Sequence, residues 1–199
     1  MSQGKRTNWK FGIVATCVLC VSLAFPAHGQ SADPSDSSEY LIKAGFIYNF
    51  AKLMEWPDPV FPQPNSPIVI GVLGNTDPFQ GTLDDVLRGK QVNGHPFVVK
   101  HLKSKDDIKG CNILFVTSSE TAHADELLHQ IRGLPILTIG DTPGFAERGG
   151  IIDFVVEDNK VRFDIDVQAA KQADITISSR LLTLARIVPD MAADGRKPQ

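Results

Sequence analysis

Residues 67–74 read PIVIGVLG, a short run of mostly β-branched apolar residues between a proline and a glycine. Such a run is typical of a strand that is buried on both faces of a parallel sheet. Three later segments are predicted to be its neighbours: HPFVVKHL at 95–102, CNILFVT at 111–117 and LPILTIG at 134–140. Helices are predicted between the strands, within residues 75–89 and over 118–131. This alternation predicts an α/β fold, a mostly parallel, doubly wound sheet with helices on both faces.

The part of the chain after residue 150 predicts an antiparallel hairpin. Residues 151–156 and 161–167 flank a polar turn, and in the second segment apolar residues alternate with Arg162, Asp164 and Asp166. The alternation predicts one packed face and one solvated face. Two aspartates on one face suit paired-carboxylate chemistry or cation binding, but a charged face also protects a hairpin from edge pairing, and we favour that interpretation.

Two helices are predicted to follow the C-terminal hairpin. The first is a short helix near residues 168–173, and the second is a longer one over 178–188. Ser178 or Ser179 is expected to cap the longer helix, because a hydroxyl at this position accepts a hydrogen bond from a free N–H of the first turn.

Residues 39–56 predict an N-terminal helix that ends before Pro57. Six apolar residues recur at helical spacing on one face: Ile42, Phe46, Ile47, Phe50, Leu53 and Met54. Leu41 and Tyr48 lie on the opposite side, and Trp56 leads into a proline-rich crossover, so the helix is more apolar than one buried face requires. Leu41, Tyr48 and Trp56 are therefore the candidate partner or dimer surface. The alternative is that the crossover buries them.

The first 29 residues differ from the rest of the chain. They hold three basic residues and no acid, followed by an apolar run from Phe11 to Phe25 that is too short to span a bilayer. We interpret them as a signal peptide that directs the protein out of the cytoplasm, with a retained membrane anchor as the alternative. The expected organisation is a signal peptide at 1–29, a flexible lead-in at 30–37, a single α/β domain at 38–188 and a frayed tail at 189–199.

Charge and cysteine content bear on two properties of the protein, nucleic-acid binding and disulfide formation. The chain has 20 basic and 23 acidic residues, and three of the basic ones lie in the leader, which leaves 17 against 23 and a formal net charge of −6. A mildly acidic domain is a poor partner for nucleic acid, which needs clustered Lys and Arg. Removing the leader also leaves Cys111 as the only cysteine, so no disulfide within the chain is expected.

Ligands of doubly wound sheets bind outside the carboxyl ends of the parallel strands. The polar residues predicted at that edge, which form the candidate ligand crevice, are Asn75, Asp77, Ser118, Ser119 and Asp141. Gly71 and Gly74 lack the G-x-G-x-x-G spacing of a dinucleotide site, and no Walker lysine follows them. An ordinary turn from strand to helix is the better interpretation of these glycines.

Nothing else in the sequence predicts a catalytic residue, a cofactor or a metal. His123 and His129 are six residues apart, so they do not share a helix face as metal ligands do at i, i+4 spacing. No G-x-S-x-G elbow is present. Cys111 opens a strand predicted to be buried, where an inert thiol is commoner than a nucleophile.

Five blocks of the mature chain, in their order and spacing, resemble the YfiR family of small periplasmic proteins. They are KAGFIYNFAKLMEWP at 43–57, IGVLGNTDPF at 70–79, CNILFV at 111–116, ILTIGDTPGFAERGGIIDF at 136–154 and VRFDIDVQAAKQADITISSRLLTLARIV at 161–188. The resemblance implies an α/β fold, a periplasmic location, a tendency to form homodimers and a regulatory rather than enzymatic role.

The resemblance also implies a partner. The named member of the family represses a membrane-bound diguanylate cyclase by binding its periplasmic part, and so controls cyclic di-GMP and biofilm formation. We therefore expect an inner-membrane signalling protein as the partner, either a diguanylate cyclase or a histidine kinase, and a protein that does not itself span the membrane after signal cleavage. Some relatives use additional cysteines for redox control, and the unpaired Cys111 departs from that pattern. A periplasmic small-molecule sensor that uses the strand-end crevice is the alternative.

Overall fold

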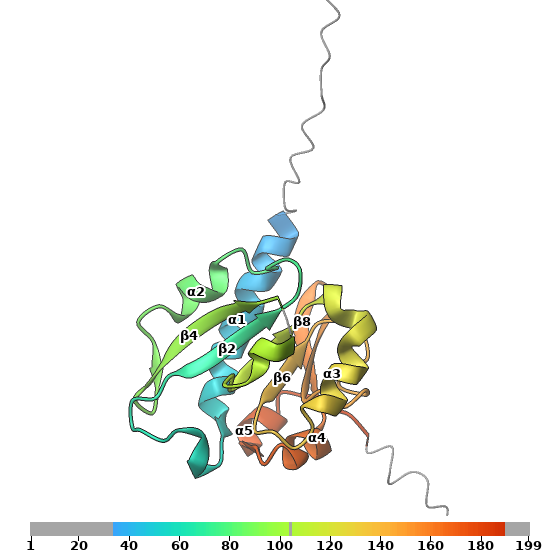
Figure 1. Cartoon of the computed structure of the whole chain (residues 1–199). Coiled ribbons are helices and arrows are strands. Elements are labelled where there is room, and N and C mark those ends of the chain that lie inside the picture. Colours follow the sequence, from blue (N-terminus) through green and yellow to red (C-terminus); the bar gives the residue numbers. More distant parts are fainter. Residues whose placement is uncertain (1–33, 104, 190–199) are drawn as a thin grey trace, which may run out of the picture. The chain divides into compact units, whose positions relative to one another are not determined.

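The computed structural model describes residues 34–103 and 105–189, and its centre is one mixed β-sheet (Figure 1). The strands lie in the order β10-β8-β7-β6-β5-β2-β4-β3. Their bounds are β2 Ile68–Leu73, β3 Gln91–Val92, β4 His95–Leu102, β5 Ile113–Val116, β6 Leu137–Gly140, β7 Ile152–Glu157, β8 Lys160–Ile165 and β10 Arg186–Ile187. Five neighbouring strands are parallel, namely β4, β2, β5, β6 and β7. β7 and β8 form the predicted antiparallel hairpin. The predicted α/β class and the hairpin are confirmed.

The sheet separates two hydrophobic clusters. All six residues of β2 are buried, and they alternate between the clusters: Ile70 belongs to the first and Val69 to the second. The first cluster includes residues of α1 (Pro34–Leu53), α2 (Thr82–Leu87), α4 (Val167–Gln172) and α5 (Ser179–Leu182). The second includes α3 (Ala124–Gln130) and lies on the other face. Figure 1 shows α1 behind the sheet and α3 in front of it.

The N-terminal helix differs from its predicted bounds at both ends. Helix α1 begins at Pro34, a residue whose fixed φ suits the first helical position. It ends at Leu53, where the chain enters the short strand β1 (Met54–Glu55), which pairs with β9 (Thr176–Ile177). The prediction that the helix continues to Trp56 was therefore wrong, because pairing with a strand more than 120 residues later takes over the last turn. Ile42 was also expected on the buried face, yet it is 49% exposed.

The C-terminal helix is much shorter than predicted. Ser178 caps α5 as expected, its side chain accepting a hydrogen bond from the Arg180 N–H, but the helix ends at Leu182. Residues Arg186–Ile187 instead form β10, which pairs in parallel with Asp164 and Ile165 of β8. A neighbouring strand with free hydrogen-bonding groups favours the extended form for this β-branched segment.

Three 3₁₀ helices complete the described part of the chain. They are η1 (Asp58–Val60), η2 (Lys105–Ile108) and η3 (Ser118–His123). The last of these occupies the first half of the segment where a single α-helix was predicted from Ser118 or Ser119 onward, so α3 starts six residues later than expected.

Candidate functional site

The carboxyl ends of β2 and β5 meet at the predicted crevice. The Asn75 N–H donates to the Ser119 Oγ at 3.1 Å, and the Ser119 and Thr117 hydroxyls lie 2.8 Å apart. A Cβ atom on Gly74 would lie 1.9 Å from the Thr117 Oγ1, so only glycine permits this close approach. The structure therefore joins Asn75 and Ser119, whereas the carbonyl oxygen of the neighbouring Ser118 accepts a hydrogen bond from the Thr121 hydroxyl.

Asp77 holds the loop before α2. Its Oδ1 accepts the Phe79 N–H at 2.9 Å, and its Oδ2 accepts the Gly81 N–H at 3.1 Å. Both carboxylate oxygens are thus used within five residues of the chain, a common arrangement for an aspartate in a turn. The Nδ1 atom of His101 lies 3.9 Å from the same carboxylate.

Asp141, which follows β6, lies in a buried polar cluster with residues of α1. Its Oδ2 accepts the Tyr40 hydroxyl at 2.7 Å and the Lys43 Nζ at 3.0 Å. The Lys43 Nζ also lies 2.7 Å from the Glu39 carboxylate and 4.3 Å from the centre of the Tyr40 ring. The side chains of Lys43 and Asp141 are only 4% and 3% exposed. The Oδ1 atom of Asp141 is buried without a hydrogen-bond partner among the described residues.

The five residues predicted for the crevice are therefore engaged in three different ways. Asn75 and Ser119 bond to each other, Asp77 bonds to its own loop, and Asp141 bonds to α1. Sequence reasoning missed Lys43 and Tyr40 as partners of Asp141. One signal was available, because Lys43 is one helical turn before Ile47 and lies on the same face of α1, which the apolar pattern predicts to be buried.

Two further carboxylates are buried on the hairpin, side by side on paired strands. Asp153 of β7 is directly opposite Asp164 of β8. Burial raises the pKa of Asp153 to about 6, and the nearby charges of Glu147 and Asp164 act in the same direction. The Phe145 N–H donates to the Asp153 Oδ2 at 2.9 Å and opposes the rise. A carboxyl group with this pKa changes its charge close to neutral pH.

The prediction that Asp164 lies on a solvated face was wrong. Asp164 is 5% exposed, because β10 lies beside β8 and the Arg186 Nη2 donates to its carboxylate at 2.6 Å. Arg186 also bonds the Glu157 carboxylate at 2.7 Å. Asp166 accepts hydrogen bonds from the first turn of α4 and acts as its N-cap. These two aspartates therefore have separate structural partners.

The three residues of the candidate partner surface differ in exposure. Leu41 is 52% exposed and lies beside Ile42, which is 49% exposed. Tyr48 is partly buried and contacts the Phe97 ring, with 5.9 Å between ring centres. Trp56 is partly buried and contacts Phe61 of the proline-rich crossover, with 6.0 Å between ring centres. We call Leu41 and Ile42 the α1 apolar patch.

Trp56 lines a small aromatic cavity of about 260 Å³. Phe61 and His95 stack on each other there, with ring centres 4.4 Å apart. The His95 Nδ1 lies 2.7 Å from the Ser66 carbonyl oxygen, whereas the Trp56 indole N–H is buried without a partner in the described chain. A second cavity of about 250 Å³ lies between the end of α3 and α4.

Metal-ligating side chains and the Cys111 thiol are the remaining candidates for chemistry. Within residues 34–103 and 105–189, no group of three or more His, Cys, Asp or Glu side chains is arranged to hold a metal ion. Cys111 is 5% exposed, and burial raises the pKa of its thiol. Among the helices that the structure describes, none combines the length and hydropathy of a membrane span.

Two solved structures are similar in fold at low sequence identity. One is described as an ABC domain from Streptococcus pneumonia in complex with L-Trp, with 12% identity, a TM-score of 0.46, and coverage of 60% of this chain and 55% of that one. The other is a conserved domain protein from Vibrio cholerae, with 15% identity, a TM-score of 0.44, and coverage of 78% and 60%. This chain spans less than two thirds of either structure, and neither likeness bears on function.

Sequence comparison, unlike the two structural likenesses, assigns the chain to a family. A search of curated proteins found no match. The family described as YfiR/HmsC-like matches residues 40–186, which extend from the second turn of the described part of α1 to β10 and include every residue of the predicted crevice. The chain therefore belongs to the YfiR/HmsC-like family.

Proposed function

We propose that this protein is a non-enzymatic periplasmic regulator that binds the periplasmic part of an inner-membrane diguanylate cyclase and holds it inactive. The observation that carries the proposal is the family match over residues 40–186. In this proposal the leader at 1–29, which lies outside the described residues, exports the protein, and the partner is the source of cyclic di-GMP for biofilm formation. A histidine kinase is the second class of inner-membrane partner.

The α1 apolar patch supports a role in binding. Leu41 and Ile42 are adjacent in sequence and both about half exposed, although Lys43 and Ala44, the next two residues of the same helix, are buried. Burial of large apolar side chains by a partner stabilises the complex by about 25 cal/mol for each Å² removed from water. We assign the partner surface to Leu41 and Ile42, with Tyr48 and Trp56 supporting the helix from partly buried positions. A homodimer is the further assembly that we propose.

Repression needs a difference in affinity between two states of the partner. A regulator that binds both states equally shifts nothing, and moving a cyclase from 1:99 to 99:1 in favour of the inactive state takes about 5.5 kcal/mol. An envelope signal would then release the enzyme by reducing this difference.

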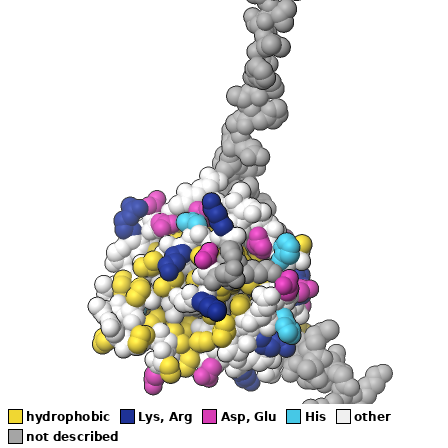
Figure 2. Space-filling view, viewed as in Figure 1, with side chains coloured by type: hydrophobic (Ala, Val, Ile, Leu, Met, Phe, Trp, Pro, Cys, Tyr) yellow, Lys and Arg dark blue, Asp and Glu magenta, His cyan; other side chains and the backbone are white. Residues whose placement is uncertain are grey.

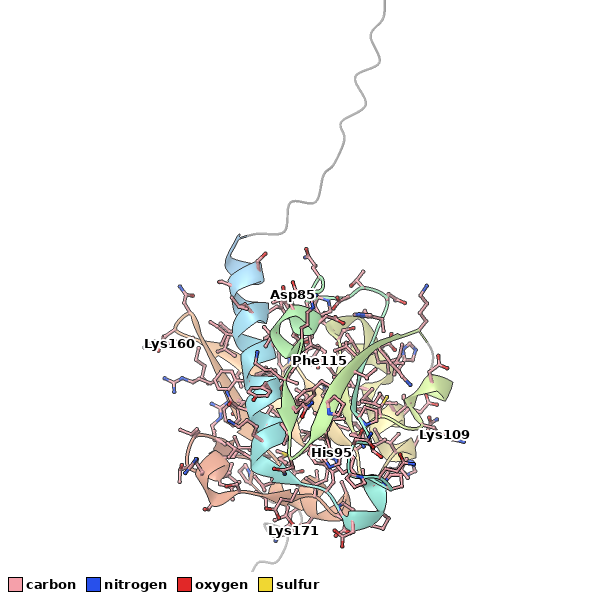
Figure 3. All side chains as sticks on the ribbon, turned by 90° about the vertical axis from the view of Figure 1, so that its left-hand side faces the viewer. Asp85, His95, Lys109, Phe115, Lys160 and Lys171 are labelled. Carbon is pink, nitrogen blue, oxygen red and sulfur yellow. The ribbon has the colours of Figure 1, made fainter. Side chains whose placement is uncertain are left out.

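Two measurements test the proposal. Deletion of the gene should raise cellular cyclic di-GMP, and a photo-crosslinking amino acid at position 41 should capture an inner-membrane signalling protein in intact cells. The matched control places the same amino acid at Lys171, an exposed residue of α4 far from the α1 apolar patch (Figure 3). Unchanged cyclic di-GMP together with no captured membrane protein at position 41 would contradict the proposal.

A periplasmic small-molecule sensor is the second candidate. One observation favours it, namely the buried Oδ1 atom of Asp141, which has no partner among the described residues at the edge where ligands of such sheets bind. Thermal-shift screening should then find a saturable ligand whose effect Asp141→Ala abolishes. A ligand that stabilises the wild type and Asp141→Ala equally would place its site elsewhere.

A further inference from the structure

The outer edge of β4 is open over most of its length. β3 pairs only with His95 and Pro96, whereas β2 pairs with residues 97–102 on the inner side. Within the residues that the structure describes, no strand lies beside 97–102 on the outer side. Figure 3 shows this side of the molecule, with α1, α2 and β4 toward the viewer.

The hydrogen bonds to β2 show which backbone groups of β4 are free. The Gly74 N–H donates to the Leu102 carbonyl at 3.3 Å, so the backbone groups of Leu102 face β2. Because N–H and C=O groups point to opposite sides at successive residues of a strand, those of Phe97, Val99 and His101 point outward. This row of donors and acceptors is a template for one more strand.

A groove runs along the same edge. It has a volume of about 340 Å³ and lies between β4, α2 and the turn after α2. Its apolar lining comes from Leu87, Pro96, Phe97 and Val99. Because alternate side chains of an added strand point to the same face, every second residue of a bound segment would enter this groove.

The charge along this edge is basic, in contrast to the acidic domain around it. Residues 86–103 contain Arg88, Lys90, Lys100 and Lys103 and no Asp or Glu, although Asp85, just before them, forms an ion pair with Arg88 at 2.6 Å. All four side chains are exposed, and Figure 2 shows basic and hydrophobic side chains together on the face that carries β2 and β4. Asp84 of α2 is the acidic residue in the lining of the groove.

We propose that the outer edge of β4 binds an extended acidic segment of a partner protein as an additional strand. Main-chain hydrogen bonds to Phe97, Val99 and His101 would supply the affinity, alternate apolar side chains would fill the groove, and acidic residues would lie beside Lys100 and Lys103. The inference goes beyond the proposed function, because it concerns a different surface from the α1 apolar patch and does not depend on the identity of the membrane partner.

A second copy of this chain fits the edge less well than an acidic segment does. Antiparallel pairing of two β4 edges would place Lys100 and Lys103 of both copies along one interface, and like charges on neighbouring strands are destabilising. Lysine on an exposed edge is one of the devices by which proteins avoid such self-pairing.

The test uses the protein without residues 1–29 and a fluorescent ten-residue peptide of alternating Val and Glu, with the matched Val and Lys peptide as the control probe. Fluorescence anisotropy should show saturable binding of the acidic peptide alone. Val99→Pro removes an outward N–H without touching the pairs to β2 and should weaken binding at least tenfold. The double variant Lys100→Glu/Lys103→Glu should do the same, whereas Lys160→Glu/Lys171→Glu, the same change of net charge at two exposed lysines outside β4, should leave binding within twofold of wild type.

Three results would overturn the inference. One is equal binding of the two peptides, or no saturable binding of the acidic one. Another is unchanged binding by both the Val99→Pro and the charge-reversed variants while their circular dichroism matches the wild type. The third is sedimentation of the wild type as a dimer that Val99→Pro converts to a monomer, which would identify a second copy as the occupant. Amide exchange adds a direct readout, since the peptide should protect the Val99 and His101 amides.

Discussion

The Lys43 Nζ of α1 lies 3.0 Å from the Asp141 carboxylate after β6, and both side chains are almost completely buried. The two residues are 98 positions apart in sequence. Their contact attaches α1 to the end of the central sheet, and Lys43 directly follows Ile42 of the α1 apolar patch. A partner that binds the patch would therefore act on a helix that is tied to the predicted crevice.

Breaking this pair from one side should destabilise the domain. Asp141→Ala leaves a buried ammonium group with Glu39 as its remaining partner, and removal of one member of a buried ion pair costs about 3 kcal/mol or more. The double variant Lys43→Met/Asp141→Leu should recover most of that loss, because no charge is left buried. Urea unfolding of the single and double variants measures both effects, and an equal loss in both would argue against a buried charge as the cause.

Asp153 should make the stability depend on pH. Its pKa is about 6 in the folded protein against an ordinary value of 3.8, so between these values the folded state keeps a proton that the unfolded chain has lost. The free energy of unfolding should therefore fall as pH rises from about 4 to 6, by roughly 3 kcal/mol, and change little above that window.

Asp153→Asn isolates this contribution. The amide oxygen can still accept the Phe145 N–H, but the side chain no longer titrates. Urea unfolding at pH 4, 5, 6 and 7 should show the variant gaining stability relative to wild type as pH rises. Parallel curves for the two proteins across this range would exclude Asp153 as the titrating group.

The same substitution should have opposite effects at two glycines. A Cβ atom on Gly150 would lie 2.2 Å from the buried Phe145 ring, so Gly150→Ala should cost about 2 kcal/mol through overpacking. Gly45 lies inside α1 with nothing within 4 Å of the added atom, so Gly45→Ala should stabilise the domain by about 0.5 to 1 kcal/mol. Thermal unfolding of the two variants compares them directly, and a melting temperature lowered in both would show that the space beside Gly45 is not open in solution.

Cys111 should be unreactive while the domain is folded. The side chain is 5% exposed and burial raises the pKa of the thiol, so both access and thiolate content are low. In the protein without residues 1–29, Ellman's reagent should react at the rate of unfolding in buffer and within seconds in 6 M guanidinium. Rapid reaction in buffer, or a disulfide-linked dimer after mild oxidation, would contradict this and reopen redox control between chains.

The strands were predictable because their signal is local. Residues 68–73 alternate between two hydrophobic clusters, and an uninterrupted apolar run is what such a strand needs. The segment 178–188 shows the limit of the same reasoning, since its helical pattern was overridden where Arg186 and Ile187 pair with β8. The pairing partner is 22 residues away, and no local pattern reports its free edge.

The candidate site was predictable in its place but not in its contacts. Asn75, Ser119 and Asp141 do follow parallel strands, as the α/β pattern requires. That Asp141 bonds Lys43 and Tyr40, and that Asp77 bonds its own loop, depends on side-chain directions that residue spacing does not give. The open edge of β4 was missed for a similar reason, because a strand's sequence does not state which of its sides has a neighbour.

By itself, the sequence determined the order of the six longer strands of the sheet, the α/β class and the resemblance that family comparison bears out, because each rests on local hydrophobic pattern or on residue identity. Only the tertiary structure decided which charged groups are buried and which backbone groups remain free. Asp141, Asp153 and Asp164 look like ordinary surface residues in the sequence, and they lie inside because distant segments cover them and supply or withhold their partners.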